Sequence, residues 1–230
     1  MESKVFLAMT EREMEEFLPE KLAYMACRFS PYSSGLTNLP SELPPNSMLL
    51  LDDSMPIKGH DPKVTATQLQ ELVHRFSPSA VLLDFQNPVT PEGKEMVSAI
   101  LQALPCPVAV TEQYATFFDC PVFLSPPPVN VPLQKHLTPW LNRGIFLEVT
   151  GDRQQFTVTE RGCNVVPLPA GTVYETPQID RKLHCHYHVD IYSDKAVFTL
   201  QRTKNDLLTM AEEALQLGVR GAVGLYQELK

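Results

Sequence analysis

Short apolar runs, each followed by polar residues, recur along the chain. Residues 5–9, 48–51, 81–83 and 145–149 are rich in Val, Leu, Ile and Phe. Apolar runs this short are typical of strands that are buried on both faces. The stretch from residue 65 to 76 instead has its apolar positions at helical spacing. The alternation of the two patterns predicts a parallel α/β architecture.

Threonine residues stand at the expected starts of four helices. Thr10 and Thr203 are each followed three residues later by an acidic residue, which is the spacing of a capping box. Thr65 is followed at the same spacing by a glutamine, and Thr90 by Pro91, which favours the first helical turn. The helices expected from these signals cover residues 11–18, 65–76, 92–104 and 207–217.

Carboxylates end several of the predicted strands at a regular interval. Asp52, Asp84 and Glu112 follow successive apolar runs about 30 residues apart, the length of one βα unit in an eight-unit barrel of roughly 250 residues. With 230 residues, the chain is long enough for such a barrel as one domain, residues 1–230. We therefore expect an α/β fold of the TIM-type (β/α) barrel, closed or nearly closed. A doubly wound open sheet places the same strands equally well.

The segment from residue 150 to 202 departs from this plan. Its strand-like runs alternate apolar and polar positions and are separated by short polar turns, such as the one at residues 193–195. Period-two alternation with short turns indicates antiparallel hairpins. We expect a β-hairpin insertion, 150–202, within the C-terminal third of the barrel.

Composition narrows the possible partners and location. The net charge of −8 and the pI near 5.2 give no basic surface for nucleic acid or anionic lipid. No window approaches about 18 consecutive apolar residues, and the first ten residues do not resemble a signal peptide. The five cysteines are odd in number and form no Cys-x-x-Cys motif, which fits reduced thiols. These features predict a soluble cytoplasmic protein that binds neither nucleic acid nor membrane.

The stretch from Ser79 to Pro88 carries the most specific motif. It resembles the fourth-strand signature of the chitinase-like glycoside hydrolases of family 18, Asp-Gly-x-Asp-x-Asp-x-Glu followed by an aromatic residue and Pro. Asp84 matches the last Asp, Phe85 the intervening residue and Pro88 the closing Pro. Gln86 stands where the family has its Glu, and Ser79 and Leu82 stand at its first two Asp positions. In that family the Glu protonates the glycosidic oxygen, and the preceding Asp orients the N-acetyl group of the substrate.

The resemblance implies a barrel with a sugar-binding groove and altered chemistry. A neutral amide is not an acid, so Gln86 cannot supply the proton of the ordinary mechanism. What remains is a groove that binds a saccharide or polyol without turnover, or hydrolysis that uses another carboxylate. For turnover, we expect Glu112 as the proton donor and Asp84 as the stabilising carboxylate.

Other polar residues are expected to share the same rim, because the carboxyl ends of parallel barrel strands meet at one face. Paired carboxylates there suit glycosidic cleavage, and they also suit a divalent cation bound through oxygen ligands. Two tyrosines are expected to supply a stacking wall for a sugar ring, although aromatic residues at such positions also serve in packing. The expected substrate-binding residues are Asp52, Asp53, Gln86, Tyr114, Glu148 and Tyr226.

Three histidines alternate with apolar residues near the end of the insertion. His184, His186 and His188 project from one face if this segment is a strand, and imidazoles at such spacing can chelate zinc. The more ordinary interpretation is the solvent-facing side of a hairpin, so these residues are weak metal candidates for a metal-dependent hydrolase. Because the sequence contains no Gly-x-Gly-x-x-Gly and no P-loop motif, we expect no nucleotide cofactor, and no other cofactor is indicated.

A second functional class stays open. A barrel scaffold can serve as a non-enzymatic interaction protein, with the hairpin region 150–202 used for self-association or partner docking. Edge strands of such hairpins can pair across a twofold axis, which would make a homo-oligomer.

Overall fold

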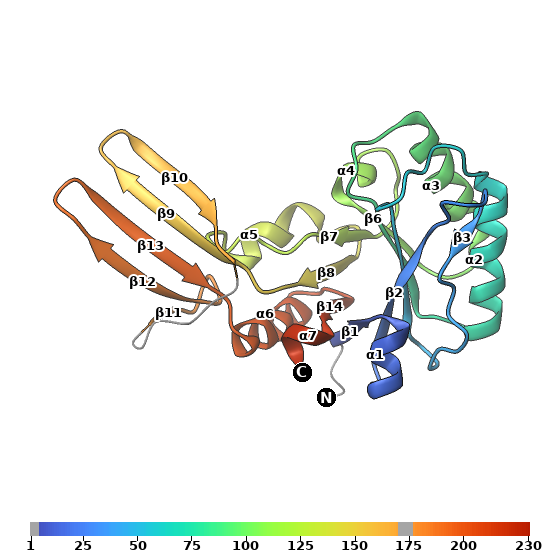
Figure 1. The fold of residues 1–230 in the computed structure, drawn as a ribbon, viewed down its shortest axis with the longest axis horizontal. Coiled ribbons are helices and arrows are strands. Elements are labelled where there is room, and N and C mark those ends of the chain that lie inside the picture. Colours follow the sequence, from blue (N-terminus) through green and yellow to red (C-terminus); the bar gives the residue numbers. More distant parts are fainter. Residues whose placement is uncertain (1–4, 170–176) are drawn as a thin grey trace.

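Eight parallel strands close into a barrel in the computed structural model, which describes residues 5–169 and 177–230 (Figure 1). The ring closes because the first strand pairs with both the second strand and the last one. This confirms the predicted TIM-type barrel, and the open doubly wound sheet is wrong. The strands, in order round the barrel, are β1 (Val5–Met9), β2 (Leu22–Phe29), β4 (Met48–Asp52), β5 (Ala80–Asp84), β6 (Val108–Thr111), β7 (Val122–Leu124), β8 (Ile145–Val149) and β14 (Gly221–Leu225).

The helices outside the barrel are uneven in length. Among the described residues, no helix joins β2 to β4, and the short strand β3 (Leu36–Thr37) pairs antiparallel with β2 instead. Several of the other connections hold less than two turns of helix. The helices are α1 (Glu11–Glu16), α2 (Pro62–Phe76), α3 (Pro91–Ala103), α4 (Glu112–Ala115), α5 (Leu133–Leu137), the 3₁₀-helix η1 (Thr138–Trp140), α6 (Lys204–Gln216) and α7 (Tyr226–Leu229).

Three helix starts or ends differ by two or more residues from the sequence prediction. Helix α6 begins at Lys204, three residues before Leu207, because Thr203 is itself its N-cap residue. Helix α2 begins at Pro62, three residues before Thr65, because the carboxylate of Asp61 accepts a hydrogen bond from the Lys63 N–H and caps the helix there. Helix α1 ends at Glu16, since Phe17 has extended backbone angles. None of the described helices is long and apolar enough to cross a membrane.

The core has two layers. One layer lies between the barrel strands and the outer helices, and the second fills the barrel interior. The interior is packed with bulky side chains from several strands, so it is a solid core and not a pore. These side chains include Phe6, Met48, Leu50, Leu82, Phe123 and Phe146.

The insertion between β8 and α6 is a separate antiparallel sheet that projects from the barrel, on the side opposite α2 (Figure 1). This confirms the predicted hairpin insertion, of which residues 170–176 lie outside the described residues. Its strand order is β10-β9-β13-β12-β11. The bounds are β9 (Arg153–Thr159), β10 (Gly162–Pro167), β11 (Gln178–Asp180), β12 (Cys185–Ile191) and β13 (Lys195–Gln201).

Polar contacts fix the insertion to the barrel at its base. The guanidinium of Arg202, only 4% exposed, donates to the carbonyl oxygens of Pro127, Pro128 and Leu183. His186 Nδ1 lies 2.7 Å from Oδ2 of Asp206 in helix α6. The insertion is therefore tied both to the loop after β7 and to the start of α6.

Candidate functional site at the barrel mouth

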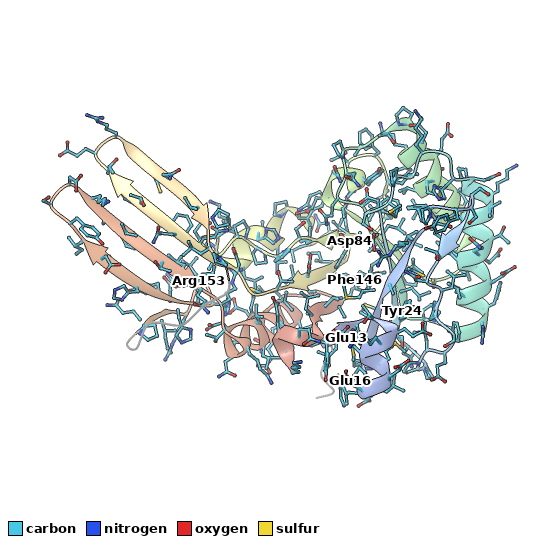
Figure 2. All side chains as sticks on the ribbon, viewed as in Figure 1. Glu13, Glu16, Tyr24, Asp84, Phe146 and Arg153 are labelled. Atoms are coloured by element: carbon cyan, nitrogen blue, oxygen red, sulfur yellow. The ribbon has the colours of Figure 1, made fainter. Side chains whose placement is uncertain are left out.

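Three carboxylates extend the inward-facing series of barrel residues toward the carboxyl ends of the strands. Side chains alternate along a strand, so the residue two positions after an interior residue is also interior. Asp52 follows interior Leu50 in this way, Asp84 follows Leu82, and Glu148 follows Phe146. The acidic groups therefore lie next to the packed interior core, at the opening of the barrel formed by the carboxyl ends of the strands, which we call the mouth. Asp84 lies on the side facing the insertion (Figure 2).

Asp52 and Asp84 are direct neighbours. They are register partners on the adjacent strands β4 and β5. One oxygen of Asp52 accepts the Ser54 N–H at 2.8 Å, and one oxygen of Asp84 accepts the side-chain amide of Gln86. Burial raises the pKa of Asp84, and the charges of Asp52 and Asp53 add to this rise, while the Gln86 hydrogen bond opposes it. Two carboxylates and one amide thus stand together on this side of the mouth.

Glu148 approaches the same mouth from strand β8. Two strands, β6 and β7, separate β8 from β5 in the ring. Burial raises the pKa of Glu148 from 4.5 to about 7, and the negative charges of Asp84 and Glu228 contribute further. Asp84 is thus among the charges that raise the pKa of Glu148, and both side chains belong to the inward-facing series at the ends of their strands.

Asp53 has a different environment from its neighbour Asp52. Its side chain is 3% exposed, and its two carboxylate oxygens accept the backbone N–H groups of Gln86 and Asn87 at 2.9 and 3.1 Å. Its own carbonyl accepts the side-chain amide of Asn87. Asp53 therefore holds the loop that presents Gln86, a role that the sequence prediction of a substrate-binding carboxylate did not foresee.

Glu112 stands at the rim between β6 and β7. It is the first residue of α4, and its carboxylate accepts the hydroxyl of Ser125 at 3.0 Å. The carbonyl of Ser125 contacts Nε2 of His136 at 2.9 Å. Glu112 thus belongs to a small polar network at the strand ends, beside the interior series and not part of it.

The two tyrosines expected to form a stacking wall lie in packed surroundings. Tyr114 is 1% exposed and packs edge to face on Phe85, with ring centroids 5.7 Å apart. Tyr226 packs against the outer core layer, where its ring is stacked on Phe17 at 6.0 Å. Both rings serve the packing around the barrel, and Tyr114 also lines the cavity between the loops that follow β4 and β5.

Arg28 is a mouth residue that the sequence pattern did not reveal. It is the register partner of Asp52, so it lies on the same side of the sheet. Its Nε is buried and has no hydrogen-bond partner among the described residues. The alternation of strand β2 shifts between Tyr24 and Cys27, and this irregularity turns Arg28 inward and Cys27 into the outer core. A cation therefore accompanies the acidic groups.

The three histidines do not converge. His184 precedes strand β12 and pairs with Glu213, His186 pairs with Asp206, and His188 lies 3.1 Å from the carboxylate of its neighbour Asp190. Within residues 5–169 and 177–230, no three His, Cys, Asp or Glu side chains are grouped to hold a metal ion. Each imidazole is directed to a different carboxylate, so the three side chains are not arranged round one common position.

Two cavities adjoin the strand ends. One of about 470 Å³ lies between the loops that follow β4 and β5, where Asp53, Lys58, Asn87 and Glu92 contribute to its wall. The other, of about 390 Å³, lies where the insertion leaves the barrel, beside Arg202. The first cavity is bordered by Asn87, the residue after Gln86, and by Tyr114, and its wall is mainly apolar.

No protein-family model matches the sequence, and a search of curated proteins gives no match. Solved structures do share the fold. A chitinase-like agglutinin from Robinia pseudoacacia aligns with a TM-score of 0.59 at 13% identity, covering 99% of this chain and 95% of that one. The spore cortex-lytic enzyme SleL of Bacillus cereus aligns with a TM-score of 0.56 at 10% identity, covering 98% of this chain and 71% of that one.

A family 18 chitinase of Cycas revoluta is similar to the same degree. Its structure as a double mutant in complex with (GlcNAc)4 has a TM-score of 0.55 at 10% identity, covering 96% of this chain and 94% of the chitinase. At such low identities the comparison establishes the fold. The closed barrel predicted from the sequence is therefore a fold that this chain shares with these chitinase-like structures.

Proposed function

We propose that this protein binds a saccharide or a similar polyol at the mouth of its barrel. The observation that carries the proposal is the set of interior carboxylates, Asp52, Asp84 and Glu148, on three strands of one closed barrel. Carboxylates and amides are the groups that recognise sugar hydroxyls, and the C-terminal end of the strands is where barrels of this type place their sites. The amide of Gln86 extends this set.

Structures with the same fold support a saccharide as the ligand. One of them is a chitinase in complex with (GlcNAc)4, and another is named a chitinase-like agglutinin. Gln86 occupies the position of the acid in the family motif, so binding does not depend on the ordinary proton donor. N-acetylated oligosaccharides are therefore the first ligands to test.

Isothermal titration of the full chain with (GlcNAc)4 and a panel of other oligosaccharides tests this proposal. We expect a saturable heat of binding, weakened about tenfold or more in D84N, because a hydrogen bond to a charged group contributes about 1.5–3 kcal/mol. The variant E71Q is the matched control, since Glu71 is exposed on helix α2. The proposal is overturned if none of the oligosaccharides binds, or if D84N and wild type bind with equal affinity.

A second candidate function has its own observation. One face of the insertion sheet is apolar across four strands, where register pairs align Ile191, Ala196, Val158 and Cys163 in one row. Ile191 is 83% exposed. Exposed apolar sheet faces are typical of association surfaces, so this face favours the alternative of a self-associating or partner-docking protein.

Light scattering tests that alternative. The chain has a mass of 25.8 kDa, so a dimer formed through this face should give about twice that mass. The variant V165D, which places a charge on the same face, should give the mass of the monomer. N164D is the matched control, because Asn164 is the next residue on β10 and faces the opposite side of the sheet. A strictly monomeric wild-type protein at high concentration excludes self-association.

A further inference from the structure

The mouth has an amide where a proton donor is expected, but it also has a carboxyl group on a different strand. Cleavage of a glycosidic bond requires a proton on the departing oxygen, because an alkoxide is a poor leaving group. Gln86 cannot provide this proton. Of the acidic residues at the strand ends, Glu148 combines a position in the barrel interior with an environment that favours the protonated form.

The geometry of Glu148 differs from that of Glu112, the donor expected from the sequence. Glu148 is the last inward residue of β8, directly above Phe146 and beside Val223 of strand β14. Glu112 stands after β6 as the start of a helix, and its carboxylate is already engaged by the hydroxyl of Ser125. Of these two glutamates, Glu148 is the one that belongs to the same inward-facing series as Asp84.

The relation between Glu148 and Asp84 suits a pair with two roles. They are the last inward-facing residues of β8 and β5, two strands that β6 and β7 separate in the ring, and the charge of Asp84 contributes to the raised pKa of Glu148. Burial raises the pKa of Asp84 as well, but Asp84 accepts the hydrogen bond of the Gln86 amide, which opposes this rise and favours its ionised form. The side chain of Glu148 accepts no comparable hydrogen bond among those found in the described residues, and burial raises its pKa to about 7. One carboxyl is thus suited to give a proton and the other to stay charged.

We infer that Glu148 is the proton donor for cleavage of a glycosidic bond at the barrel mouth, with Asp84 as the carboxylate that stabilises the positive charge on the sugar. This inference rests on the proposed saccharide binding. The proton passes from Glu148 to the bridging oxygen, the bond between that oxygen and C1 breaks, and its electron pair stays on the oxygen. A water molecule then adds to C1, and its proton returns to Glu148. The two products are sugars that each carry a new hydroxyl group.

Leaving-group dependence is the experiment that isolates this role. Hydrolysis by the full chain is measured for a 4-nitrophenyl chito-oligoside panel, for unmodified (GlcNAc)4 and for the 2,4-dinitrophenyl analogue, whose leaving group needs no protonation. We expect E148Q to lower kcat about 10²–10⁴-fold on (GlcNAc)4 and less than about tenfold on the dinitrophenyl substrate. The wild-type rate falls as the pH rises past about 7, and this limb is absent in E148Q.

The possible outcomes are distinguishable. E71Q reports the effect of the same chemical change far from the mouth, and titration with (GlcNAc)4 verifies that E148Q still folds and binds. Saccharide binding without any hydrolysis by wild type overturns the role of Glu148 and leaves the proposed binding intact. A leaving-group-dependent loss in E112Q but not in E148Q assigns the proton to Glu112 and also overturns the inference. Absence of binding removes the proposed function itself.

Discussion

Replacement of Glu148 by Gln tests the electrostatics of the mouth without any knowledge of the ligand. In the folded protein, burial and the charge of Asp84 raise the pKa of Glu148 from 4.5 to about 7. A carboxyl whose pKa is raised on folding stabilises the fold below its unfolded pKa, and this stability is lost as the pH rises toward the folded value. The loss corresponds to about 3 kcal/mol between pH 4.5 and pH 7.

The variant E148Q carries a neutral side chain of nearly the same shape at every pH. We expect its free energy of unfolding to equal that of wild type near pH 4.5 and to exceed it by about 3 kcal/mol above pH 7.5. The difference in the free energy of unfolding should grow between these limits, because Glu148 ionises there in the unfolded wild-type chain but stays protonated in the folded one.

Urea denaturation between pH 4.5 and pH 8.5 provides the measurement, with the fluorescence of the single tryptophan, Trp140, as the probe. E71Q is the control, since Glu71 is exposed and its replacement should leave a small difference that does not vary with pH. A constant difference between E148Q and wild type over the whole range refutes the reasoning, because the buried carboxyl then has no raised pKa.

Three further substitutions test other parts of the structure. D53A leaves two loop N–H groups without their carboxylate acceptors and should lower the free energy of unfolding by about 2 kcal/mol in urea denaturation; a change below about 0.5 kcal/mol contradicts the anchoring role. G93A places a methyl group against the hydroxyl of Tyr114 and should cost about 2 kcal/mol, whereas a gain in thermal stability contradicts this contact. H186A removes the contact with Asp206 and should speed amide exchange in β12 while the barrel strands stay protected; unchanged exchange means that the contact does not hold the insertion.

Much of the barrel could be predicted from local patterns. Buried parallel strands are continuous apolar runs, and the threonine caps mark where helices begin, so neither needs knowledge of distant contacts. The interior placement of Asp52, Asp84 and Glu148 follows from the same alternation once the strands are assigned. The antiparallel insertion could also be predicted from a local pattern, because apolar and polar positions alternate along its strands with period two.

Some site residues could not be predicted in this way. Arg28 turns inward because the register of β2 shifts between Tyr24 and Cys27, and simple alternation would have placed Cys27 there instead. Tyr114 lies near the strand ends in sequence, but its ring packs on Phe85 within the core. Pattern alone does not distinguish an aromatic residue that packs from one that faces a ligand.

The sequence by itself determined the strands, most of the helices and the series of inward carboxylates, because these depend on local spacing and capping. The tertiary structure decided that the ring closes, that Asp53 holds the Gln86 loop, and that the charge of Asp84 contributes to the raised pKa of Glu148. These features arise between residues far apart in the chain. Pairing, burial and mutual charge exist only after the strands have been brought together.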